Sequence, residues 1–235
     1  MQMSVRFEAS WCGSDLGGRR SCPYTYDYYP HDSLPPLDQR RLKGTFEWLG
    51  EHTGTSADRV TELRAVTEEL DQKGLSLPQD FSTYFTSANL PDILGGQSLT
   101  CCWSSLSKPI PSPVEPGAFL VRFFRDQQDC VLWYFYLRPG QSAFVVHSHL
   151  EYEYEYEAHD SAGEFNGNSD IEDFDEQMDA LQYCAPTFEE WAYRFWIENR
   201  ISDTLDGNDE SSLDEGQRAY VKHYDSDVRV SAPVV

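Results

Sequence analysis

Apolar side chains recur with the period of a helix in three segments of the N-terminal half of the chain. Residues 37–49 carry apolar positions at helical spacing and predict a first helix. Residues 55–74 predict a second helix, for which Ser56 is a good N-cap residue. Residues 77–85 predict a short third helix with Pro78 in its first turn. These three helices would precede the rest of the fold.

The middle of the chain changes to short apolar runs that are rich in β-branched and aromatic residues. The runs cover residues 99–103, 118–124, 130–137 and 143–146, and turn-forming residues separate them. The last two connections are short, which favours an antiparallel meander over parallel crossovers. Residues 131–137 are apolar on both faces and therefore predict a central strand that is covered on both sides.

A capping box formed by Thr187 and Glu190 begins an amphipathic helix that extends to about residue 201. A weaker pattern predicts another helix over residues 212–224. Helices first, then a meander of about four to six strands, then a helix that packs on the sheet predict an α+β fold.

The chain is accordingly expected to have three parts. Residues 1–36 lack a helical period and are expected to form an irregular segment. Residues 37–205 would form the α+β domain, with an acidic insertion at residues 151–183. Residues 206–235 would form an acidic C-terminal extension that contains the last helix.

Charge changes this picture more than any other property of the composition. The 18 Lys and Arg residues against 40 Asp and Glu residues give a net charge of −22, which argues against nucleic acid or an anionic membrane as a direct partner. Residues 151–215 hold 21 acidic residues and only two basic ones. Residues 151–183 hold 12 acidic residues and no Lys or Arg. A basic protein is the partner that such a segment would attract.

The start of the chain lacks the apolar run of a signal peptide, and no apolar run is long enough for a transmembrane helix. The six cysteines show no C-x-x-C spacing and are interpreted as reduced packing residues. We therefore expect a cytoplasmic protein.

Glutamate and tyrosine alternate strictly from residue 151 to residue 157. If this segment is extended, the carboxylates lie on one face and the tyrosines on the other. It could then be an acidic contact strand for a basic partner, with tyrosines as interface anchors. An edge strand kept soluble by its charge explains the pattern equally well. The predicted contact residues are Glu151, Tyr152, Glu153, Tyr154, Glu155, Tyr156 and Glu157.

A second acidic cluster lies in residues 164–179. Its spaced carboxylates could occupy the cationic groove of a nuclease in place of nucleic-acid phosphates, or the segment could be a solvated insertion. The spacing does not match a calcium loop. The predicted contact residues here are Asp170, Glu172, Asp173, Asp175 and Glu176.

His147, His149 and Glu151 would lie on one face of an extended strand, and His159 could complete a metal site with them. A polar strand end is the simpler interpretation, so no metal and no cofactor are predicted. The chain also lacks nucleophile, P-loop, zinc-protease and dinucleotide-binding motifs. We therefore predict that the protein is not an enzyme, with a metal-dependent enzyme as the least favoured alternative.

The order of these elements resembles the SMI1/KNR4 (SUKH) superfamily over roughly residues 37–203. The resemblance rests on Leu77-Pro78-x-x-Phe81-x-x-Tyr84-Phe85, Phe119-x-x-Arg122-Phe123-Phe124 before Asp126-Gln127-Gln128, Trp133-Tyr134-Phe135-Tyr136-Leu137, Val145-Val146 and Pro186-Thr187-Phe188-x-x-Trp191. The chain departs from the family pattern at Ala88-Asn89-Leu90, where the family usually has Asn-Gly.

The resemblance implies a non-catalytic α+β binding module with no catalytic residues to carry over. Bacterial members of the family are immunity proteins that neutralise toxins, often nucleases, and eukaryotic relatives are regulatory scaffolds. The family binds partners with its sheet and sheet edges, which here would include the strands near Trp133 and Val145. We therefore predict an immunity protein, a monomer or weak dimer, for a basic toxin, with a regulatory scaffold as the alternative.

Overall fold

The computed structural model describes residues 5–24, 26–153, 178–206 and 210–225. Its central element is a six-stranded antiparallel sheet with strand order β3-β5-β6-β7-β8, in which β4 also pairs with β5. The strands are Cys101–Cys102 (β3), Ile110–Pro111 (β4), Phe119–Asp126 (β5), Leu132–Leu137 (β6), Phe144–Ser148 (β7) and Gln182–Ala185 (β8). The described part of the chain therefore confirms an α+β fold with an antiparallel sheet.

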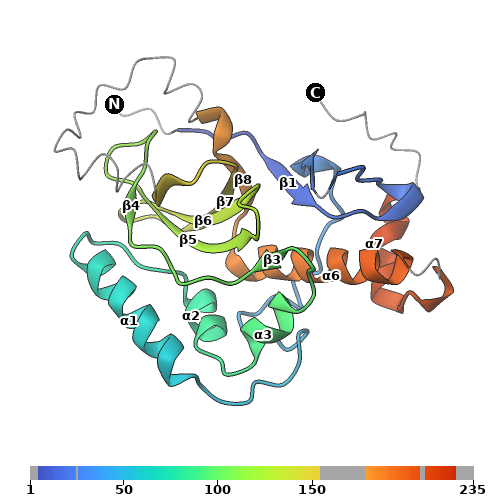
Figure 1. The fold of residues 1–235 in the computed structure, drawn as a ribbon, viewed down its shortest axis with the longest axis horizontal. Coiled ribbons are helices and arrows are strands. Elements are labelled where there is room, and N and C mark those ends of the chain that lie inside the picture. Colours follow the sequence, from blue (N-terminus) through green and yellow to red (C-terminus); the bar gives the residue numbers. More distant parts are fainter. Residues whose placement is uncertain (1–4, 25, 154–177, 207–209, 226–235) are drawn as a thin grey trace.

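Five α-helices accompany this sheet in the described residues: Ala57–Asp71 (α1), Gln79–Phe85 (α2), Leu90–Gly95 (α3), Phe188–Asp206 (α6) and Glu215–Asp225 (α7). Figure 1 shows α1, α2 and α3 on one side of the sheet, with α6 passing along the sheet and extending beyond it to α7. No helix among the described residues combines the length and the apolar character needed to cross a membrane.

Aromatic rings fill the core between the sheet and the helices. Phe123 of β5 stacks on Phe135 of β6 with ring centroids 4.4 Å apart, and Trp191 of α6 meets Phe123 edge-on at 4.9 Å. Phe81 of α2 contacts Phe135 at 4.7 Å. Alternate residues of β6, among them Tyr134, enter a second buried cluster on the opposite face of the sheet. The prediction that this strand is covered on both sides is therefore confirmed.

Local signals located most of the helices correctly. The N–H of Arg59 donates to the Ser56 side chain at the start of α1, and the N–H of Glu190 donates to Thr187 Oγ1 at the start of α6. Helix α7 lies within the predicted range apart from its last residue.

Residues 37–49 do not form the predicted helix. Gly44 and Phe46 have φ values of 75° and 55°, which a right-handed helix cannot contain. Glu189 holds this loop from α6, because its carboxylate accepts hydrogen bonds from the N–H groups of Gly44 and Phe46 and from the Trp48 indole. A carboxylate that is distant in sequence therefore replaces the helical hydrogen bonds of this segment.

The N-terminal segment is more ordered than predicted. Ser10–Gly13 (β1) and Asp27–Pro30 (β2) pair as an antiparallel two-stranded sheet. The N–H of Tyr183 donates to the Glu8 carbonyl at 2.7 Å, which joins this segment to the edge of the main sheet at β8. The prediction of irregular structure is therefore wrong for β1 and β2.

A buried ion pair fastens the N-terminal segment to α6. The guanidinium of Arg20 donates to both carboxylate oxygens of Glu198, at 2.8 and 2.6 Å, and both side chains are 1% exposed. The Trp11 indole and the Tyr220 hydroxyl also donate to this carboxylate, at 2.7 and 2.6 Å. Burial alone would raise the pKa of Glu198, but the nearby Arg20 outweighs it, and the pKa lies below its ordinary value. Strand β1, the segment at Arg20 between β1 and β2, α6 and α7 thus meet at one carboxylate.

Candidate functional site

The predicted acidic contact strand begins at three residues that the structure describes. Glu151 is exposed, but Tyr152 is buried with its ring 5.6 Å from that of Tyr134, and both Tyr152 and Glu153 have helical backbone. Glu153 forms an ion pair with Arg122 of β5 at 2.5 Å. The extended alternation is therefore wrong at this point, because Tyr152 packs in the core and Glu153 neutralises an internal cation.

The other predicted contact residues lie outside the described residues, and their role remains a prediction. They are Tyr154, Glu155, Tyr156, Glu157, Asp170, Glu172, Asp173, Asp175 and Glu176.

The two described histidines of the conceivable metal site are in different surroundings. His147 is 1% exposed, its Nε2 lies 2.8 Å from Ser10 Oγ, and its ring stacks on Tyr28. His149 is exposed, and His159 lies outside the described residues. Within the described ranges no group of three or more His, Cys, Asp or Glu side chains could hold a metal ion.

The sheet positions implied by the family resemblance are buried. Trp133 is 1% exposed and Val145 is 0% exposed, with both inside the core between the sheet and α6. The segment before β1 lies against β8 at one edge of the sheet. Neither Trp133 nor Val145 can therefore contact a partner in this structure.

Exposed carboxylates instead gather where α6 ends and α7 begins. Residues 201–217 contain six acidic residues and no Lys or Arg. Those that the structure describes are all exposed: Asp203, Asp206, Glu210, Asp214 and Glu215. We call them the α6–α7 carboxylates. By contrast, Glu189 and Glu198 of α6 are buried and serve as internal hydrogen-bond acceptors.

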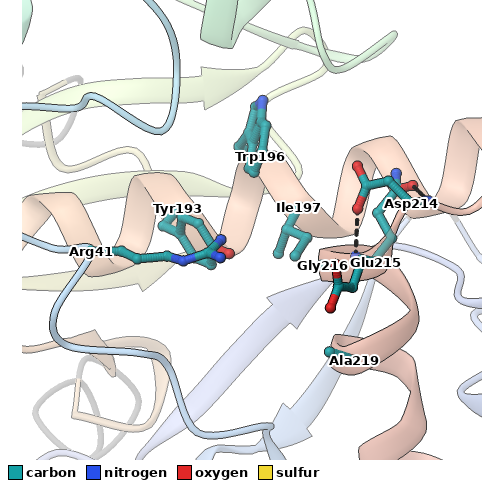
Figure 2. A pocket seen from close by; sticks show the side chains of 9 residues that line it. Arg41, Tyr193, Trp196, Ile197, Asp214, Glu215, Gly216 and Ala219 are labelled. Carbon is teal, nitrogen blue, oxygen red and sulfur yellow. Dashed lines mark hydrogen bonds between the residues drawn. The ribbon is translucent and has the colours of Figure 1, made fainter.

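A groove of about 320 Å³ adjoins these carboxylates between α6 and α7. Tyr193, Trp196 and Ile197 line it from α6, and Gly216 and Ala219 line it from α7. Figure 2 shows Arg41 at the Tyr193 end of the groove and the start of α7 at the Ile197 end. Pocket-forming residues thus come from three segments of the chain that are distant in sequence.

Asp214 holds the start of α7 in place and is fully engaged in doing so. Its carboxylate accepts the N–H of Gln217 at 2.8 Å, while its own N–H donates to Gln217 Oε1 at 2.8 Å. This reciprocal pair is a capping box. The second carboxylate oxygen of Asp214 lies 3.6 Å from Arg200, whose guanidinium also covers the ring of Trp196 at 4.9 Å.

The six cysteines, all within the described residues, give no evidence of an activated thiol. Cys12, Cys22, Cys101 and Cys184 are buried, Cys102 is half-buried and Cys130 is exposed. Burial raises the pKa of Cys22 to about 11 and of Cys101 to about 12. A thiol with a raised pKa is a poor nucleophile at neutral pH.

We expect Cys130 to react first with an excess of Ellman's reagent at pH 8, because it is the exposed thiol. The four buried thiols should react more than about 100-fold more slowly, since they need transient unfolding. A Cys130→Ser variant should lose the fast phase alone. Rapid reaction of more than two thiols in the parent protein would contradict the described burial.

Comparison with protein-family models, with curated proteins and with solved structures gives no match to this chain. The resemblance to the SMI1/KNR4 superfamily therefore stays a prediction.

Proposed function

We propose that this protein is a non-catalytic binding protein for a basic protein partner, and that its role is that of an immunity protein against a toxin. The observation that carries the proposal is the exposure of the α6–α7 carboxylates beside a groove with aromatic walls. Carboxylates of this kind accelerate the encounter with a cationic surface, and aromatic side chains supply contact area once the partner has docked.

The distribution of charge within α6 supports this proposal. Two acidic residues of this helix, Glu189 and Glu198, are used inside the protein, as the hydrogen bonds that their carboxylates accept show. Asp203, in the last turn, is exposed. Carboxylates are unfavourable at the C-terminal end of a helix, where the helix dipole is negative, and a cationic partner would remove this penalty.

The resemblance to immunity proteins suggests the class of partner, and the net charge of −22 agrees with a basic one. The acidic segment from residue 151 onwards is proposed as a second contact region. Within it, Glu151 and Asp179 are exposed among the described residues, whereas Glu153 is paired with Arg122 and is a poor choice for mutagenesis.

Reversing the charge of Asp203 and Asp206 together should slow association with the partner by about 10-fold at low ionic strength. The partner to test is the protein encoded by the adjacent reading frame. Association rates of parent and double Lys variant should be measured by stopped-flow fluorescence over a range of salt concentrations. The difference should shrink as salt rises, because screening removes the steering.

Glu68→Lys with Asp71→Lys is the matched control, because these two exposed residues have the same spacing in the last turn of α1. Both pairs of substitutions change the net charge equally, and both place two cations at the C-terminal end of a helix, where the helix dipole favours them. Equal slowing by both pairs would show that only net charge matters and would contradict a binding surface at α6–α7. Co-expression then tests the role: rescue of cell growth supports immunity, whereas tight binding to a harmless protein indicates a scaffold.

A further inference from the structure

The groove between α6 and α7 carries charged side chains of both signs. Its lining contains three charged residues, Arg41, Asp214 and Glu215. Asp214 is already engaged by Gln217 and Arg200. Among the described residues, the side chains of Arg41 and Glu215 form no hydrogen bond or ion pair, and both residues are exposed. A ligand for this groove is therefore best matched when it carries one charge of each sign.

The two charges lie at opposite ends of an apolar floor. Figure 2 shows Arg41 beside Tyr193, and the start of α7 with Glu215 beside Ile197. Tyr193 and Ile197 are four residues apart on α6, so about 6 Å of helix separates them. Trp196 lines the groove between these two ends. A bound ligand should therefore have its own charges separated by a similar distance, with an apolar part between them.

We propose that this groove binds a short zwitterionic peptide of about two residues with apolar side chains. The ligand carboxylate would accept from the Arg41 guanidinium, which can bind it in a bidentate manner. The ligand ammonium would donate to Glu215. An extended dipeptide separates its termini by about 7 Å, whereas a single amino acid carries both charges on one carbon atom. The volume of about 320 Å³ is at the small end of the range for ligand pockets.

This site shares Glu215 and the aromatic groove with the surface proposed for a basic protein, but the two proposals are tested at different residues. Dipeptide binding is tested at Arg41 and Glu215, whereas steering is tested at Asp203 and Asp206. The double Lys variant of Asp203 and Asp206 should therefore bind the dipeptide as the parent does. Failure of one proposal leaves the other testable.

The probe is the dipeptide Leu-Leu with free termini, compared with its N-acetyl form and its C-terminal amide. Binding should be followed by two-dimensional NMR of ¹⁵N-labelled protein, with the Gly216 amide and the Trp196 indole as local reporters. We expect the free dipeptide to shift these two signals, and each blocked form to bind about 10-fold more weakly, since each loses one charge-assisted hydrogen bond.

Substitutions at two exposed residues test the contacts of the two ends of the ligand one at a time. Glu215→Gln should weaken binding of the free dipeptide about 10-fold and leave binding of the N-acetyl form unchanged. Arg41→Gln should also weaken binding of the free dipeptide about 10-fold, but it should leave binding of the C-terminal amide unchanged. Glu210→Gln, outside the groove lining, is the control and should change nothing. Equal affinity of all three peptides, equal effects of Glu215→Gln and Glu210→Gln, or no shift of either reporter at about 10 mM dipeptide would overturn the proposal.

Discussion

A Glu198→Gln variant is expected to lose about 3 to 5 kcal/mol of the free energy of unfolding. The carboxylate accepts from Arg20, Trp11 and Tyr220 in surroundings that exclude water. Glutamine offers one acceptor oxygen and turns an amide group towards the donors. The guanidinium of Arg20 would then remain charged and buried without its counter-ion, which is far more costly than the loss of one hydrogen bond.

Urea denaturation followed by circular dichroism measures this loss. Glu210→Gln is the matched control, because Glu210 pairs with the neighbouring Arg19 but is 66% exposed, so its loss should cost less than about 1 kcal/mol. A double variant, Arg20→Met with Glu198→Leu, should recover much of the loss, because it removes both charges from the core. Similar costs for Glu198→Gln and Glu210→Gln would contradict a buried, structural role of this ion pair.

This ion pair also explains why the N-terminal segment could not be predicted. Strands β1 and β2 are short, and a connection of more than ten residues separates them, so no local sequence pattern predicts that they pair. What holds the segment is Glu198, which lies 178 residues beyond Arg20 in the sequence. Charge counting included Glu198 among the 21 acidic residues of residues 151–215, although it is buried. Only the fold shows which carboxylates are used internally.

The elements that sequence did predict are those whose cause is local. The side chains of Ser56 and Thr187 accept N-cap hydrogen bonds at the start of their helices. The apolar residues on both faces of β6 can be recognised from this strand alone. The segment 37–49 has a helical pattern too, but it also contains Gly44, which adopts a positive φ. Gly44 was the sequence signal against a helix in this segment. The hydrogen bonds to the distant carboxylate of Glu189 stabilise the loop that forms instead.

The acidic contact residues illustrate a limit of periodicity. Strict alternation predicts a strand only if no single side chain gains more from another conformation. Tyr152 gains burial against Tyr134, and Glu153 gains an ion pair with Arg122, a residue 31 positions away. The groove could not be predicted at all, since Arg41, Trp196 and Glu215 come together only in the folded chain. The charge excess near residues 201–217 was visible in the sequence, but its place beside an aromatic groove was not.

The folded protein should lose stability as the pH falls from 7.5 to 5, and His147 should be a main cause. Burial, together with the electrostatic influence of the neighbouring His149, lowers the pKa of His147 from 6.5 to about 4, although the contact with Ser10 opposes this. Between pH 6.5 and pH 4 this histidine is protonated in the unfolded chain but stays neutral in the folded protein. Stability is therefore complete above pH 6.5 and decreases as the pH falls towards 4. The whole change is about 3 kcal/mol, of which about 2 kcal/mol is reached at pH 5.

A His147→Gln variant isolates this contribution, because glutamine can still hydrogen-bond Ser10 but does not titrate. Free energies of unfolding at pH 7.5 and pH 5 should differ by about 2 kcal/mol less in the variant than in the parent. Some pH dependence should remain, since burial also lowers the pKa of His31. His149→Gln is the control at an exposed neighbour and should leave most of the difference unchanged. An unchanged pH dependence in His147→Gln would show that His147 is protonated without opening the contact between β1 and the main sheet, because Ser10 and His147 join these two elements.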